Sequence, residues 1–384
     1  MKQQDKLLVT YCEILLTSTI ITSLVVAFLI VEKEVLLGVI IGLGILGFFI
    51  AKSRGIPHKI DQVYREHPWF FYLTILLPMI IAIVFCRHEH FALFMIASVA
   101  IYATACLGLT LQLGYAGLTN FAGASFLGVG GYTVAVLTNQ SIPNALVILL
   151  AGLMAAIIGS LLILPVLRTR GHYAALVTIA FALLFKTFLE INDTLGGPQG
   201  LKITSFKIFG LDFNEPFLGG SFYLSYVVAA LLLMVGVFVI TRLIEKSWLG
   251  LHLDAVRLDE TVASCFGINI AAWKILAFTL GNFFIGLAGG LYAQMLGHIA
   301  PTNFTFGDSL ILISIVILGG IGNPLGVIPA AFLIIVLPEK LQFIQEYRFL
   351  LFAILVILVL VYRPEGLLKR GLRSFYRNWG REKA

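Results

Sequence analysis

The sequence predicts an all-α, polytopic bundle of transmembrane helices, and three observations support this fold class. Of the 384 residues, 59% are hydrophobic and only 12% are charged, whereas a soluble domain carries roughly 25% charged residues. Apolar runs long enough to cross a bilayer recur along the chain. The sequence has no alternating period-two pattern of the kind that membrane barrels show. Because hydrocarbon offers the backbone no hydrogen-bond partners, such spans must be helices.

The predicted spans follow one another from the N-terminus, separated by short polar segments. They cover residues 12–31, 35–51, 69–86, 91–113, 120–138, 144–166, 174–191, 222–244 and 274–296. The next apolar stretch, 308–338, is interrupted by a Gly319-Gly320-Ile321-Gly322-Asn323-Pro324 segment that predicts a broken or re-entrant helix, and a last run covers 349–362. The first run has the length of a full span and no small-x-small cleavage site, so we expect a retained helix rather than a signal peptide.

The distribution of lysine and arginine orients these spans. With the N-terminus inside, most of the 26 basic residues fall in cytoplasmic segments, including the basic tail at 373–384. Both termini are therefore expected in the cytoplasm, with an even number of crossings among about 10–12. The net charge of +6 is dispersed over loops, which favours contact with a lipid membrane and argues against nucleic acid as a partner.

Residue types that support catalysis or metal binding are sparse in this sequence. The four cysteines have no paired spacing, so neither a disulfide scaffold nor a metal site is indicated. His88 and His90 lie in a short turn without two further ligands nearby. The chain has no Gly-Lys dipeptide and hence no phosphate loop, and it has no Gly-x-Ser-x-Gly or His-Glu-x-x-His motif. We expect no metal, no cofactor and no enzymatic activity.

One cytoplasmic loop predicts an amphipathic helix over about 251–267. Apolar residues recur there every three or four positions, which places them on one helical face: Leu251, Ala255, Leu258, Val262 and Phe266. Asp254 and Glu260 are each three residues from Arg257, an arrangement that adds a few tenths of a kcal/mol to helix stability. Gly267 follows at the position of a C-terminal cap. Such a helix can lie on the membrane, dock into a partner protein or be a plain surface helix.

A glycine-rich segment, residues 108–131, permits two interpretations. Small residues let membrane helices approach closely, which is their commonest role. Broken helices whose ends face a cavity are also how transporters expose backbone groups to polar solutes. The segment therefore supplies the candidate pathway residues, which are small or polar: Gly117, Thr119, Asn120, Gly123 and Ser125.

Several short motifs, in this order, carry a family resemblance. They are Leu113-Gly-Tyr-Ala-Gly117, Phe126-Leu-Gly-Val-Gly-Gly-Tyr132, Leu167-Arg-Thr-Arg-Gly-His-Tyr173, Gly196-Gly-Pro-Gln-Gly-Leu201, Phe266-Gly-Ile-Asn269, Lys274-Ile-Leu-Ala-Phe278, Gly286-Leu-Ala-Gly-Gly-Leu-Tyr292, Leu318-Gly-Gly-Ile-Gly-Asn-Pro-Leu-Gly326 and Arg363-Pro-Glu-Gly-Leu367. From about residue 101 to 372, the chain resembles the permease subunits of bacterial ATP-driven importers for branched-chain amino acids. It is most similar to the longer of the two permeases. Residues 1–68 carry no family signature.

The resemblance implies an organisation and a set of partners. Residues 69–372 would form the permease domain, after N-terminal membrane helices at 1–68 and before the basic tail. The partners would be a second, homologous permease, separate ATPase subunits, an external solute-binding protein and a small-molecule substrate, all at a bacterial inner membrane. The helix at 251–267 would be the coupling helix that docks into the ATPase. The residues expected to act there are Ala255, Arg257, Glu260, Ala263 and Gly267.

One departure from the family pattern leaves the substrate open. The segment 119–124 reads Thr-Asn-Phe-Ala-Gly-Ala, where the family commonly reads Leu-Ser-Leu-Gly-His-Ala, and Asn-Phe-Ala is closer to the companion permease. Branched-chain amino acids are the leading substrate class, with urea or short amides as the alternative. A secondary transporter or channel is a further alternative. It would need ion-coupling charges within spans, where the sequence offers mainly Lys186 and Glu190, which we interpret as a salt bridge.

Overall fold

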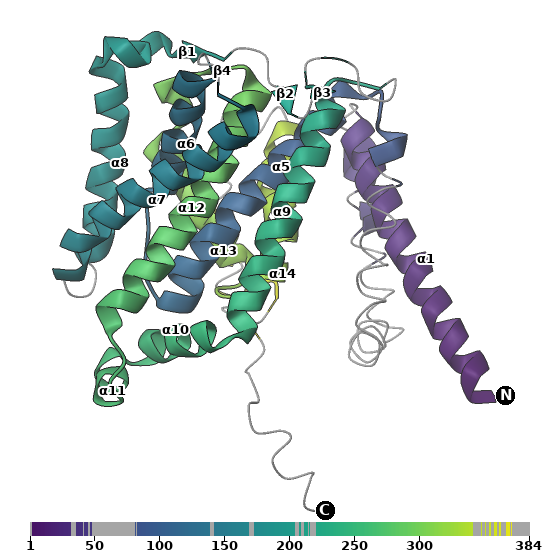
Figure 1. Cartoon of the computed structure of the whole chain (residues 1–384). Coiled ribbons are helices and arrows are strands. Elements are labelled where there is room, and N and C mark those ends of the chain that lie inside the picture. The colour runs from purple at the N-terminus through teal and green to yellow at the C-terminus, as the bar shows by residue number, and fades with distance from the viewer. Residues whose placement is uncertain are drawn as a thin grey trace, which may run out of the picture. The chain divides into compact units, whose positions relative to one another are not determined.

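The computed structural model describes most of the chain and shows it to be almost wholly helical (Figure 1). The described residues are 2–31, 36–40, 42–44, 47, 81, 83–138, 142–168, 173–203, 207–208, 211–213, 215, 220–340, 347, 350, 353–354, 357–358, 361, 366–368 and 370. The chain forms two compact units, Met1–Ile96 with Glu215–Val227, and Ala97–Asn214 with Val228–Ala384. The predicted division at residues 68 and 372 stays a prediction, since neither position lies within the described residues.

The first unit contains α1 (Lys2–Ile30) and the start of α5 (His90–Leu109). The first predicted span is confirmed as a helix, and α1 extends it toward the N-terminus. Near α5, the backbone N–H of Ser221 donates to the carbonyl of Arg87 at 2.9 Å. The Ser221 hydroxyl also lies 2.7 Å from Nδ1 of His90. The predicted span at 35–51 is described at 36–40, 42–44 and 47, which are helical. The predicted span at 69–86 lies largely outside the described residues.

The core of the second unit is formed by three helices, α6 (Gly123–Leu137), α7 (Asn144–Arg168) and α12 (Ile270–Leu296). Glycines let these backbones meet. A Cβ built on Gly286 of α12 would lie 2.5 Å from the Ala155 side chain and 2.7 Å from the Ala151 carbonyl oxygen of α7. A Cβ built on Gly108 of α5 would lie 2.5 Å from the carbonyl oxygen of Gly281. Gly108, at the start of the glycine-rich segment, therefore lies at a close helix contact, as the packing interpretation of that segment predicts.

Two further long helices belong to the bundle, α8 (Tyr173–Ile191) and α9 (Tyr223–Lys246). After α8 the chain bends by 88° into the 3₁₀ helices η2 (Asp193–Leu195) and η3 (Gly197–Gln199). Lys186 and Glu190 form the predicted salt bridge, with 3.4 Å between Nζ and Oε1.

The strands are short and lie in the connections. β1 (Leu201–Lys202) pairs antiparallel with β4 (His298–Ile299), and β2 (Lys207–Ile208) pairs with β3 (Leu211–Asp212). The 3₁₀ helix η4 (Pro301–Asn303) follows β4.

The last described helices are α13 (Phe306–Gly319) and α14 (Pro324–Lys340). α13 begins with a capping box, in which the Thr305 hydroxyl accepts from the Asp308 N–H at 3.3 Å and the Thr305 N–H donates to the Asp308 carboxylate at 3.0 Å. The chain leaves helical geometry between Gly319 and Pro324, so the break predicted within 308–338 is confirmed.

Among the described residues, five helices are long and apolar enough to cross a membrane, or six if the bent α8–η3 pair is one span. The five are His90–Tyr115, Asn144–Leu167, Tyr223–Lys246, Ile270–Leu296 and Pro301–Gly319. The chain is therefore a multi-pass helical membrane protein. The total of about 10–12 crossings stays a prediction, because the expected spans at 69–86 and 349–362 fall mainly outside the described residues and the span at 35–51 is described only in part.

Candidate functional site at two helix breaks

The first helix break covers residues 110–122 and lies between α5 and α6. α5 widens into a π-helix, η1 (Thr110–Tyr115), and the chain is non-helical from Gly117 until α6 begins. The Leu118 N–H donates across the turn to the carbonyl of Gln112 at 2.9 Å. Gly117 has φ +68°, a conformation that glycine adopts without steric cost. The sequence thus places glycine where the backbone must turn out of the helix.

The second helix break, residues 320–323, lies between α13 and α14 and touches the first. Gly320 and Gly322 have φ of +110° and +85°. A Cβ built on Gly114 of η1 would lie 2.6 Å from the Cα of Gly322, so the two backbones are in direct contact. Any side chain at either glycine would separate the breaks.

A cluster of three buried amides, Gln112, Asn120 and Asn282, ties the first break to α12. Their exposed fractions are 0%, 2% and 0%. Asn120 Nδ2 donates to Gln112 Oε1 at 2.8 Å and to Asn282 Oδ1 at 3.2 Å, and Gln112 Nε2 donates to Asn282 Oδ1 at 3.0 Å. Asn120 Oδ1 also accepts from the Ala122 N–H at 2.9 Å. Because burying an unpaired amide is costly, these mutual bonds hold the break in one geometry.

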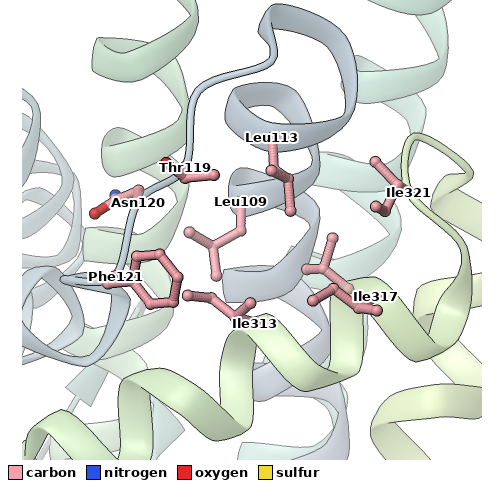
Figure 2. Close-up of a pocket in the computed structure, with 9 residues that line it drawn as sticks. Leu109, Leu113, Thr119, Asn120, Phe121, Ile313, Ile317 and Ile321 are labelled. Atoms are coloured by element: carbon pink, nitrogen blue, oxygen red, sulfur yellow. The ribbon is translucent and has the colours of Figure 1, made fainter. Parts of the chain in front are cut away.

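A pocket of about 130 Å³ opens beside the first break (Figure 2). Its walls are apolar and come from α5, α13 and both breaks: Leu109, Leu113, Ile313, Val316, Ile317 and Ile321. Thr119, Asn120 and Phe121 complete the lining along the non-helical segment. None of these nine residues is titratable or a typical metal ligand. The pocket can accept a small apolar group.

The structure separates the five predicted pathway residues into three positions. Thr119 and Asn120 line the pocket. Gly117 faces the coupling region, since a Cβ there would lie 3.2 Å from Cγ of Arg257. Gly123 and Ser125 are buried in α6 and do not line the pocket. A Cβ on Gly123 would meet Leu312 at 3.1 Å, which indicates a packing role.

The predicted coupling helix at 251–267 is in fact two helices, α10 (Trp248–Leu258) and α11 (Glu260–Cys265). Asp259 separates them with extended backbone angles, φ −159° and ψ 112°. Its carboxylate accepts from the N–H groups of Thr261 and Val262 at 2.8 and 3.0 Å, which makes it the N-cap of α11. The prediction of one continuous helix was wrong because apolar periodicity continues across the capping residue.

The face of this region that periodicity marked as apolar is the exposed one. Leu258 and Phe266 have exposed fractions of 77% and 81%. The buried side chains are those of Leu253, Val256 and Ala263. α10 lies across the ends of α9 and α12 (Figure 1). One apolar face is therefore covered by the bundle, and another is exposed.

The five predicted coupling residues are spread over both helices and the cap: Ala255, Arg257, Glu260, Ala263 and Gly267. Glu260 pairs with Lys274 at 2.6 Å, and Ala263 is 2% exposed. Gly267 has φ +76°, as expected for a glycine after a helix C-terminus. Arg257 lies against the first helix break, where a Cβ at Gly117 would meet its side chain.

Sequence reasoning missed Arg370, which lies 116 positions from its main partner. Its guanidinium donates to both carboxylate oxygens of Asp254 at 2.8 and 3.0 Å and lies 4.5 Å from the centre of the Tyr115 ring. Burial lowers the pKa of Arg257 from its usual value, the charge of Arg370 lowers it further, and Asp254 acts in the opposite direction. In the sequence, Arg370 is one of many basic residues near the C-terminus.

The buried amides Gln112 and Asn282 were also missed. Each is an isolated polar residue within an apolar run. Such residues in membrane spans are expensive and usually have a partner. That signal was present in the sequence, although it does not say which amides meet.

Comparisons with known proteins confirm the family resemblance. Residues 91–360 match the model of the family described as branched-chain amino acid transport system / permease component. The permease protein LivM of the high-affinity branched-chain amino acid transport system of Escherichia coli (strain K12) is 36% identical over 288 residues, 70% of this chain and 68% of the relative. The probable LivM permease of Methanocaldococcus jannaschii is 24% identical over 319 residues, covering 70% and 90%.

A second type of permease is also similar. The LivH permease protein of the same Escherichia coli system is 25% identical over 295 residues, 70% of this chain and 91% of the relative. No solved structure matches the chain.

Proposed function

The chain belongs to the family of permease components of branched-chain amino acid transport systems, and from this premise we propose that it forms the translocation pathway of an ATP-driven importer. The family is one of transport proteins, so the chain is a permease component and not an enzyme. In the proposed complex it pairs with a second, homologous permease. Separate ATPase subunits bind on the cytoplasmic side, and an external protein delivers the solute.

The observation that carries the ATP-driven mechanism is the open apolar face of α10 and α11. Leu258, Val262 and Phe266 are exposed there, at the end of the bundle where α10 crosses α9 and α12 (Figure 1). Apolar patches of this kind mark protein or membrane contacts. We assign the patch to an ATPase subunit because α10 also contacts the first helix break. Movement of a docked ATPase would reach the pocket directly.

The apolar pocket supports branched-chain amino acids as the substrate class. Six of its lining residues are aliphatic, and a branched side chain buries its apolar surface favourably against such walls. Urea has no apolar group to place there. LivM and LivH relatives are named as permeases for branched-chain amino acids, which supports the same choice and a pairing of two permease types. The positive-inside pattern supports cytoplasmic termini in a bacterial inner membrane.

Energy coupling requires that the ATPases bind one permease state more tightly than another. The test is therefore a reconstitution of the chain with the proteins that co-purify with it. Uptake of labelled leucine, isoleucine, valine and urea into proteoliposomes is measured with and without ATP. The proposal predicts ATP-dependent uptake of the amino acids. Flux through the chain alone without ATP would instead establish a channel or secondary transporter, and urea uptake would establish the alternative substrate class.

A matched pair of variants tests the docking face. Leu258→Ala removes an apolar side chain from α10, and Leu232→Ala removes the same side chain from the middle of α9, where it is 69% exposed. The proposal predicts that Leu258→Ala lowers ATPase recovery on purification and lowers uptake, while Leu232→Ala lowers neither. Equal ATPase recovery for both variants would contradict the assignment of this face.

A further inference from the structure

The described part of the C-terminal segment, residues 366–368 and 370, is bound to the second helix break. The Leu367 N–H donates to the carbonyl of Leu318 at 2.8 Å, and the Leu368 N–H donates to that of Gly319 at 3.2 Å. The Asn323 side chain donates to the Leu368 carbonyl at 3.2 Å. The two backbone bonds satisfy carbonyls at the C-terminus of α13 that the helix itself leaves open. The segment therefore moves with the second break.

Arg370, at the end of this segment, reaches three other elements. It holds Asp254 of α10 through two bonds of 2.8 and 3.0 Å. Its Nε lies 3.7 Å from the Glu245 carboxylate at the end of α9. On the first helix break, it contacts the Gly114 carbonyl at 3.5 Å and the face of the Tyr115 ring. Its side chain is only 13% exposed.

The chemistry of these contacts suits a rigid connection. A guanidinium is planar and carries several N–H donors in a fixed arrangement, so the bond pair to Asp254 sets the orientation of the whole group. That orientation then determines where the remaining N–H groups point and how the guanidinium faces the tyrosine ring. A buried pair of this kind contributes little net stability, but removing one partner leaves an uncompensated charge. The orientation of Arg370 relative to Asp254 is therefore strongly determined.

We propose that Arg370 and the segment 366–368 transmit displacement of α10 to both helix breaks, and that this link makes solute uptake depend on ATPase movement. A connection from α10 to both helix breaks would act on the pocket, because both breaks contribute to its walls. One wall comes from Leu113 of the first break and another from Ile321 of the second. When α10 moves, Arg370 moves both breaks and the pocket changes shape. This role is an addition to the proposed function and rests on it.

The test measures uptake and ATP hydrolysis together in proteoliposomes of the assembled complex. Arg370→Met removes the guanidinium and keeps an unbranched apolar chain. Asp254→Asn keeps the shape of the partner and removes its charge. The proposal predicts that either variant lowers solute uptake per ATP hydrolysed by about tenfold, within the range typical of coupling between sites. ATP hydrolysis itself should stay near the wild-type rate.

Two comparisons separate transmission from a merely structural role. In the double variant, uptake per ATP should fall no further than in either single variant, because one shared link is broken in all three. Arg370→Lys retains the charge without the paired geometry, so it should restore only part of the coupling. Lys186→Met is the control, since it breaks an ion pair on α8 and should leave uptake per ATP unchanged.

Each outcome decides between defined alternatives. Normal uptake per ATP in Arg370→Met or in Asp254→Asn overturns the transmission role. If Arg370→Met does not assemble, Asp254→Asn alone decides, because it keeps the arginine and its other contacts. A wild-type complex that shows no ATP-dependent uptake would overturn the proposed function instead, and that result is visible before any variant is compared.

Discussion

Gly117 lies directly against Arg257, and a Cβ at Gly117 would come within 3.2 Å of Cγ of the arginine. The sequence suggested these two residues for different roles, one in the pathway and one in coupling. The contact shows that the first helix break and α10 meet without an intervening element. The break cannot change its geometry at Gly117 without affecting the arginine.

Gly117→Ala is expected to reduce uptake strongly. Alanine at φ +68° costs about 1 kcal/mol, and its methyl group presses on Arg257. Gly297→Ala is the matched control, because Gly297 has φ +69° but open space around it. Both variants should lose similar thermal stability, measured on the purified protein. Only Gly117→Ala should lose uptake at equal protein levels, and equal uptake in the two would contradict the importance of this contact.

Asn120→Ala should loosen the first helix break. It removes the donor to Gln112 and Asn282, and leaving the buried Oε1 of Gln112 unsatisfied costs about 1–3 kcal/mol. The melting temperature of the purified protein should fall measurably. Ser264→Ala, which removes an exposed hydroxyl bonded to the Thr261 carbonyl, should change stability by no more than about 0.5 kcal/mol. A similar melting temperature for both variants would show that the amide cluster does not hold the break.

Ile317→Trp should block the pocket. The larger side chain occupies space within the pocket of about 130 Å³, so uptake of leucine should fall while ATPase recovery stays normal. Leu310→Trp is the control, since Leu310 lies on the same helix but does not line the pocket. Uptake assays in proteoliposomes compare the two. Unchanged uptake in Ile317→Trp, at normal expression, would place the pathway elsewhere.

Asp259→Ala should destabilise α11 locally, since loss of an N-cap costs about 1 kcal/mol. Hydrogen exchange at the amides of Thr261 and Val262 should accelerate, because both donate to the Asp259 carboxylate. Asn269→Ala removes the cap of α12, which bonds Ala272 at 3.1 Å, and it should accelerate exchange there instead. Acceleration at Thr261 in both variants would show that the effect is not local to the cap.

The helices and their breaks were largely predictable from the sequence, whereas the internal structure of the coupling region was not. Hydrophobic length is a property of contiguous residues, so α7 and α12 could be located by composition alone. The break after Gly319 was equally visible, because glycine and proline act on the local backbone. The break at Asp259 was hidden, since an aspartate in an apolar pattern is compatible both with a helix interior and with a cap.

By itself, the sequence determined the membrane class, the position of most helices and the family to which the chain belongs. Only the tertiary structure decided which polar groups far apart in the sequence meet. Gln112 and Asn282 are separated by 170 positions and Asp254 and Arg370 by 116, yet each pair is hydrogen-bonded. Periodicity and propensity describe neighbours along the chain, while these contacts depend on how whole helices pack. The pocket has the same origin, because its walls come from both helix breaks and exist only when the breaks are in contact.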